Sequence, residues 1–312
     1  MDDDDMDNAL RIAYSPCPND TFVFHAWAHR LVPGAPALDV TFADIDITNG
    51  IAERRNGVSP AKPGKEFEIL KVSYAVLPWV LDEYTLLPCG GALGRGCGPL
   101  VVSKRSVSKR SATRDGGAGG ELAGRTVAVP SERSTAYLLF RLWAATEVPG
   151  GVGAIRVMPF HEIMPAVRDG RVDAGLVIHE ARFTYQEYGL SCLADMGEHW
   201  EQTTGLPIPL GAIIAKRSLG EPMLLRLAEA ARASVRMAWA DPAASREYVL
   251  AHAQEMDPVV AKQHIGLYVN EFTESLGKDG YAAVRALLTC AAAEGLVPPL
   301  GPDALDFPAE PT

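Results

Sequence analysis

Short apolar runs alternate with longer mixed stretches along this chain. Apolar runs of strand length occur at residues 10–14, 38–42, 69–72, 100–103, 124–130, 155–158, 174–178 and 210–215. Helical spacing of apolar residues occurs from about residue 19, at 134–146, and after the last strand at 221–239, 243–252, 257–269 and 280–294. Strands that alternate with helices build mostly parallel sheets, so the pattern predicts an α/β protein.

The length predicts two lobes. A chain of 312 residues exceeds the size at which one hydrophobic core usually stops growing. The apolar strands at 98–103 and 210–216 bracket the second α/β unit, as two crossing strands would bracket an inserted lobe. We therefore expect a central cleft with a hinge between the two lobes. The predicted parts are a disordered acidic tail (1–8), a discontinuous lobe 1 with the C-terminal helices (9–103 and 212–312) and an inserted lobe 2 (104–211).

Charge narrows the range of partners. The net charge is −10, and the five aspartates at positions 2–5 and 7 supply five of those charges, which leaves the body near −5. This acidic balance argues against a nucleic-acid-binding surface, and the sequence has no basic stripe with interleaved aromatic residues that would indicate one. The basic, glycine-rich segment 104–122 is interpreted as a solvated flexible loop.

The sequence does not indicate a membrane span, a metal site or a cofactor site. No apolar run approaches the roughly 20 residues that a membrane span requires, and the acidic N-terminus does not resemble a signal peptide, so we expect a cytoplasmic protein. The five cysteines include no C-x-x-C pair, no group of residues has the spacing of a metal site, and no dinucleotide fingerprint follows a strand. A reaction without metal or cofactor is the simplest interpretation.

The segment 15–22 (SPCPNDTF) follows the first predicted strand directly. Its two prolines interrupt the strand, and either Asn19 or Asp20 can cap the helix that follows. Capping side chains and free backbone N–H groups at such a joint form a polar rim where α/β proteins bind ligands. A proline-stiffened turn without a ligand would use the same residues.

One histidine stands apart from the other six. His179 immediately follows the apolar strand 174–178, so it lies at the carboxyl end of a buried strand, where a ligand crevice opens. Glu180 and Arg182 are candidates for orienting its ring. The other histidines are interpreted as packing or surface residues, and His199 is expected in a loop.

A second polar site is expected at the start of the helix 134–146. A helix N-terminus with the hydroxyls of Ser134 and Thr135 suits a carboxylate, although capping alone would also select these residues.

Six segments, taken in order, resemble the 1,4-dihydroxy-6-naphthoate synthases of the futalosine route to menaquinone. They are residues 15–22, 71–75 (KVSYA), 90–102, 134–137 (STAY), 178–185 (IHEARFTY) and 205–212 (GLPIPLGA). The resemblance implies a type II periplasmic-binding-protein fold. It also implies a carbon–carbon lyase that converts cyclic dehypoxanthinylfutalosine, a small-molecule aromatic carboxylate, into 1,4-dihydroxy-6-naphthoate.

The resemblance also implies site residues. His179 would be the proton acceptor, and Thr135 with Ala136 would bind the ligand. The family's tripeptide that matches Lys71, Val72 and Ser73 also contacts ligand, which makes Ser73 a candidate hydrogen-bond donor. Alternate residues of a strand point away from the crevice, so we expect Lys71 to contribute only its backbone. Two alternatives stay open: a chorismate dehydratase of the same pathway, and a solute-binding protein that performs no chemistry.

Overall fold

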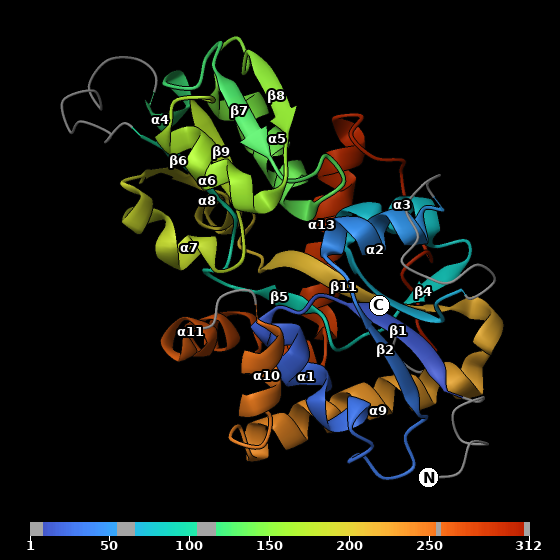
Figure 1. The fold of residues 1–312 in the computed structure, drawn as a ribbon. Coiled ribbons are helices and arrows are strands. Elements are labelled where there is room, and N and C mark those ends of the chain that lie inside the picture. The colour runs from blue at the N-terminus through green and yellow to red at the C-terminus, as the bar shows by residue number, and fades with distance from the viewer. Residues whose placement is uncertain (1–8, 55–65, 105–116, 254–256, 309–312) are drawn as a thin grey trace.

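The computed structural model describes residues 9–54, 66–104, 117–253 and 257–308. These residues form two lobes, each built around one β-sheet with helices packed on it (Figure 1). The first eight residues and residues 105–116, on which the predicted tail and most of the predicted flexible loop fall, lie outside the described residues.

The sheet of the first lobe has the strand order β2-β1-β3-β11-β4, and β5 also pairs with β11. Strands β1, β2 and β3 are parallel, whereas β11 is antiparallel to β3, β4 and β5. The strands are β1 (Leu10–Tyr14), β2 (Leu38–Phe42), β3 (Ile69–Ser73), β4 (Tyr84–Leu86), β5 (Ala92–Gly94) and β11 (Ile208–Lys216).

Helices cover both faces of this sheet, so its central strands are buried on both sides. Ile12 and Ile69 belong to a core with α1 and α9, whereas their neighbours Ala13 and Leu70 belong to a second core that includes residues of α13. The helices of this lobe are α1 (Pro18–Ala28), α2 (Ile45–Ala52), α3 (Leu77–Val80), α9 (Glu221–Ala240), α10 (Arg246–His252), α11 (Pro258–Tyr268), α12 (Glu271–Glu274) and α13 (Gly277–Ala293).

The second lobe contains the order β10-β6-β9-β7-β8. Strands β7, β8 and β9 are parallel, and β6 is antiparallel to both of its neighbours. The strands are β6 (Leu100–Ser103), β7 (Thr126–Val129), β8 (Ala154–Val157), β9 (Ala174–Val177) and β10 (Ser191–Asp195), and the helices are α4 (Gly117–Gly120), α5 (Thr135–Glu147), α6 (Phe160–Arg168), α7 (Ala181–Thr184) and α8 (Met196–Thr204).

Two chain segments connect the lobes, one between β5 and β6 and the other between α8 and β11. Arg95 in the first segment donates a hydrogen bond to the carbonyl of Gly205 in the second (3.1 Å). Gly98 in the first segment also lies so close to the first turn of α8 that an added Cβ would come within 2.1 Å of the Gly197 nitrogen. This close approach requires glycine at position 98.

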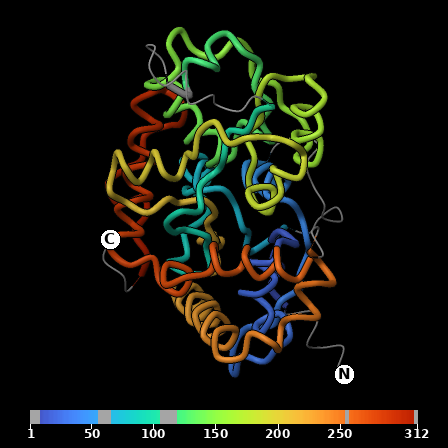
Figure 2. Tube along the Cα trace, turned by 90° about the vertical axis from the view of Figure 1, so that its left-hand side faces the viewer, coloured from blue at the N-terminus to red at the C-terminus, as the bar shows by residue number. Residues whose placement is uncertain are grey.

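The C-terminal helix α13 packs against both lobes. It contacts β11 in the first lobe and α5 in the second. Figure 2 shows it as the red helix that runs along one edge of the molecule from one lobe to the other.

Sequence and structure differ at the lobe boundary. Strand β6 was assigned to lobe 1 as a crossing strand, but it pairs with β9 and β10 in the sheet of the second lobe. An apolar run indicates burial without indicating which sheet buries it, so the crossing lies before Leu100. Strands β4, β5 and β10 and helix α2 were not predicted, and His199 lies in α8 instead of a loop.

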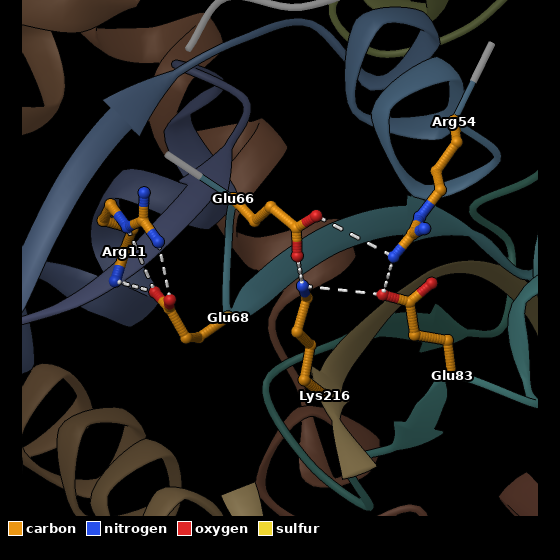
Figure 3. Close-up of polar contacts among 6 residues, drawn as sticks. All are labelled: Arg11, Arg54, Glu66, Glu68, Glu83 and Lys216. Carbon is orange, nitrogen blue, oxygen red and sulfur yellow. Dashed lines mark hydrogen bonds and ion pairs between the residues drawn. The ribbon is translucent and has the colours of Figure 1, made fainter. Parts of the chain in front are cut away.

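Charged residues gather where β3 begins and β11 ends, at the opposite end of these strands from Ser73 and Gly211 (Figure 3). Arg11 forms a salt bridge with Glu68 (2.7 Å), and Lys216 pairs with Glu66 and, at 3.5 Å, with Glu83. Arg54 joins the same network through Glu83 at 2.6 Å.

Candidate active site

A cavity lies between the two lobes, with about 620 Å³ of non-atom space that includes its open mouth. The first lobe lines it from α1, β3 and β11, and the second lobe lines it from the N-terminus of α5 and the end of β9. Of the residues predicted for the site, those that line the cavity are Asn19, Asp20, Lys71, Ser73, Ser134, Thr135, Ala136 and His179. Val72 does not line it but is fully buried in the adjacent core.

His179 follows β9 and has a left-handed backbone, with φ of 51°. A left-handed non-glycine residue is uncommon and costs backbone energy, so it is a feature found more often at functional sites than elsewhere. Its ring lies edge-on to Phe160 (centroids 6.0 Å apart) and nearly parallel to the ring of His264 (6.1 Å, 29°). Both ring nitrogens are free of hydrogen bonds to the described residues, so the ring is held by other rings.

Arg182 does not orient His179. Its guanidinium donates to the carbonyl of Gly98 (2.5 Å) and to the carboxylate of Asp195 (2.6 Å). Arg182 therefore ties the segment after His179 to the connection between the lobes. Glu180 makes no hydrogen bond to the imidazole either, within the ranges that the structure covers.

Lys71 and Asp20 form a buried ion pair at the cavity wall, each side chain being 4% exposed. Lys71 alternates with Leu70 and Val72, so it points to the sheet face covered by α1, where the amide of Asn19 donates to Asp20 (2.7 Å). The expectation that Lys71 would present only its backbone was wrong, because Lys71 and Ser73 are two residues apart and share the sheet face that lines the cavity, whereas Val72 points to the other face. Gly211 on β11 makes room for the lysine: an added Cβ there would lie 2.8 Å from Lys71 Cε.

Asn19 and Asp20 also differ from their predicted role as helix caps. Helix α1 begins at Pro18 with Cys17 at the N-cap position, and no side chain caps it. Pro18 lacks an N–H, which removes one of the donors that a cap would satisfy, so Asn19 and Asp20 stay available for the cavity. Burial raises the pKa of the Cys17 thiol well above its ordinary value, which is typical of a packed thiol and not of a nucleophile.

Asn49 in α2 orients Ser73, and sequence reasoning missed it. The Asn49 amide accepts from the Ser73 backbone N–H (2.8 Å) and donates to the Ser73 hydroxyl (3.0 Å). Because the hydroxyl oxygen already accepts from Asn49, its own O–H remains free to donate to a ligand. The spacing of polar residues in α2 gave no signal for this contact.

The N-terminus of α5 faces the cavity with backbone N–H groups. Ser134 caps the helix by accepting from the Tyr137 N–H (3.1 Å), which is the capping alternative that the sequence left open. The Thr135 hydroxyl donates to the carbonyl of Leu210 (2.8 Å) and accepts from the N–H of Ala75 (3.2 Å), so it links the two lobes. The first-turn N–H groups of Thr135 and Ala136 have no partner within the helix and can bind a carboxylate.

Two residues of α11 complete the site and were not predicted. Tyr268 lines the cavity, and burial raises its pKa far above the ordinary value, so its phenol stays protonated and can donate a hydrogen bond. His264, one turn earlier, has a pKa well below its ordinary value because of burial, with His179 and Lys71 acting in the same direction. In the sequence it is one histidine of an ordinary helix, and only the fold brings it to His179.

Within the described ranges, no cluster of three or more histidine, cysteine or acidic side chains is arranged to hold a metal ion. None of the helices in the described part of the chain has both the length and the hydropathy of a membrane span.

Comparison with solved structures identifies the fold. Protein AF1704 from Archaeoglobus fulgidus superimposes with a TM-score of 0.79 at 31% identity, over 93% of this chain and 98% of its own. The Candida albicans CA3427 gene product, described as having the generic periplasmic binding protein fold, superimposes with a TM-score of 0.64 at 11% identity, over 95% of this chain and 93% of its own. The predicted two-lobed periplasmic-binding-protein fold is confirmed.

Comparison of sequences identifies the family. A family model described as menaquinone biosynthesis matches residues 10–293. The chain is 74% identical to the 1,4-dihydroxy-6-naphthoate synthase of Streptomyces coelicolor, over 96% of this chain and 99% of that protein. It is 43% identical to the enzyme of the same name from Thermus thermophilus, over 93% and 97% of the two chains. These matches and the fold show that the chain belongs to the menaquinone biosynthesis family that includes the 1,4-dihydroxy-6-naphthoate synthases.

Proposed function

We propose that this protein is a carbon–carbon lyase that converts cyclic dehypoxanthinylfutalosine into 1,4-dihydroxy-6-naphthoate. The observation that carries the proposal is the position of His179. Its imidazole lines the interlobe cavity, and neither ring nitrogen is hydrogen-bonded to any of the described residues. In this mechanism His179 removes a proton from the sugar-derived part of the substrate, and bond cleavage then releases the aromatic product. A positioned general base contributes about 10²–10⁴ in rate.

The rest of the cavity supports this assignment. The substrate carboxylate would bind the N–H groups at the start of α5, where the helix dipole favours an anion. The Ser73 hydroxyl, oriented by Asn49, would donate to a substrate oxygen. Lys71 would add a positive charge at the opposite wall while Asp20 keeps its ammonium in place.

The same chemistry defines what else the protein would need. Proton removal by an imidazole, followed by bond cleavage that forms an aromatic ring, balances without an oxidant or reductant, so we propose a reaction without cofactor. We further propose a cytoplasmic enzyme whose partner is this small aromatic carboxylate and neither nucleic acid nor membrane, since two similar proteins are named for a biosynthetic step.

Product formation distinguishes the candidate functions. The protein would be incubated separately with cyclic dehypoxanthinylfutalosine and with chorismate, and the products would be followed by absorbance and mass spectrometry. We expect 1,4-dihydroxy-6-naphthoate from the first substrate and no turnover of chorismate. Dehydration of chorismate would support the related dehydratase instead, and binding of the first compound without turnover would support a solute-binding protein.

A further inference from the structure

Two side-chain nitrogens beside the active site lack hydrogen-bond partners. His264 is 0% exposed, and neither its Nδ1 nor its Nε2 is hydrogen-bonded to any residue that the structure describes. Buried polar atoms in folded proteins are almost always paired, because an unpaired one loses its bond to water and gains nothing in return. A fully buried imidazole with two unpaired nitrogens therefore calls for a role outside packing.

The neighbours of His264 connect it to the chemistry. The ring centroids of His264 and His179 are 6.1 Å apart, and the two ring planes are inclined by 29°. The ring of Tyr268 also packs on His264, with the centroids 4.6 Å apart. The two rings are not hydrogen-bonded to each other in this structure, and a bond between them requires a rotation that brings a nitrogen of each ring to the facing edge. Hydrogen bonds at active sites are often long without substrate and shorten once it is bound.

The electrostatic setting keeps His264 uncharged. Burial is the largest cause of the lowered pKa of His264, and the positive charges of a protonated His179 and of Lys71 lower it further. A neutral imidazole carries one lone pair, so it can accept a hydrogen bond. It is therefore an acceptor that stays neutral beside a histidine that gains a proton.

We propose that His264 is a positioning residue that accepts a hydrogen bond from one ring N–H of His179. The bond selects the His179 tautomer in which the other nitrogen is unprotonated and faces the substrate. When that nitrogen takes the substrate proton, the bond also stabilises the imidazolium, and no proton passes to His264. The inference rests on the proposed role of His179 as the proton acceptor.

Three variants test this role. His264→Phe keeps a flat ring and removes both nitrogens, so we expect turnover to fall by roughly 10–10²-fold, the effect typical of a lost partner that orients an active-site histidine. The Michaelis constant should stay within about twofold, and the melting temperature should hold or rise because two unpaired polar atoms are gone. His264→Gln, which restores an acceptor oxygen, should recover part of the lost turnover. His264→Leu gives the same comparison with Gln if the larger phenylalanine ring prevents folding.

His252→Phe is the matched control. His252 also packs on aromatic rings, Phe42 and Tyr248, but lies in α10 outside the cavity. This variant should keep full turnover.

Full turnover in folded His264→Phe would overturn the inference, as would a Gln variant no more active than the folded apolar variants. Either result would leave the role of His179 intact, because that role is tested by replacing His179 itself. Conversely, if His179→Ala retains full turnover, the proposed function fails together with this inference.

Discussion

The ammonium group of Lys71 is paired with the carboxylate of Asp20 in the wall of the cavity, where both side chains are almost completely buried. The pair joins the strand β3 to the first turn of α1, two segments that are far apart in the sequence. Burying two charges is costly, and the attraction between them offsets that cost only while both are present.

Replacing one partner should therefore be more damaging than replacing both. We expect Asp20→Asn to lower the free energy of unfolding by about 3–5 kcal/mol, because it leaves the lysine charge buried without its partner. The double variant Asp20→Asn with Lys71→Met should recover part of that loss, since no charge then remains. Denaturant unfolding of the single and double variants measures the effect. A single variant as stable as the parent would show that Lys71 does not depend on Asp20.

Replacement of His179 separates catalysis from backbone strain. His179→Ala should lower turnover by about 10²–10⁴, equivalent to roughly 3–5.5 kcal/mol of transition-state stabilisation, with the ligand still bound. His179→Gly should be equally inactive but more stable than the alanine variant by about 1 kcal/mol, because glycine adopts φ of 51° without strain. Single-turnover kinetics and thermal unfolding of both variants measure the two effects. An alanine variant with normal turnover would remove His179 from the mechanism.

The hydroxyl of Thr135 is expected to stabilise the fold. Because it bonds to Leu210 and Ala75, Thr135→Val should lower the free energy of unfolding by about 1–3 kcal/mol and not only weaken substrate binding. Thr135→Ser keeps the hydroxyl and serves as the control. If the valine variant unfolds like the parent while its Michaelis constant rises, the hydroxyl instead acts mainly on the ligand.

The lowered pKa of His264 predicts how stability changes with pH. The folded state keeps this imidazole neutral, whereas the unfolded state binds a proton near the ordinary histidine pKa of about 6.5. The unfolded chain thus binds more protons as the pH falls below that value, and the contribution of His264 to stability falls with it. We expect the decline in stability between about pH 7 and pH 5 to be smaller in His264→Phe than in the parent, measured by denaturant unfolding at each pH. Equal slopes would show that His264 titrates alike in both states.

Much of the fold could be predicted from apolar periodicity, but short or mixed elements could not. The strands β1 and β2 have the predicted bounds, and α5 begins within one residue of its predicted start at 134. Strands β4 and β5 have three residues each, too few to show a period. Helix α2 contains Gly50 and β-branched residues, which are poor helix formers.

The candidate site likewise contains residues that the sequence could predict and others that it could not. His179 and the start of α5 follow strands directly, so the general rule for α/β proteins places them at the crevice. The partners of these residues come from other elements: Asn49 reaches Ser73 from α2, and His264 reaches His179 from α11. Such pairs are set by packing between elements, which the spacing of residues along one element does not encode.

The helix α13 has a mechanical consequence. Because it rests on β11 in one lobe and on α5 in the other, the lobes cannot swing apart without shifting or breaking their contacts with this helix. Opening for substrate entry then has a cost set by residues remote from the cavity. Changes on the buried side of α13 would alter how often the site is accessible while leaving every group that contacts the substrate unchanged.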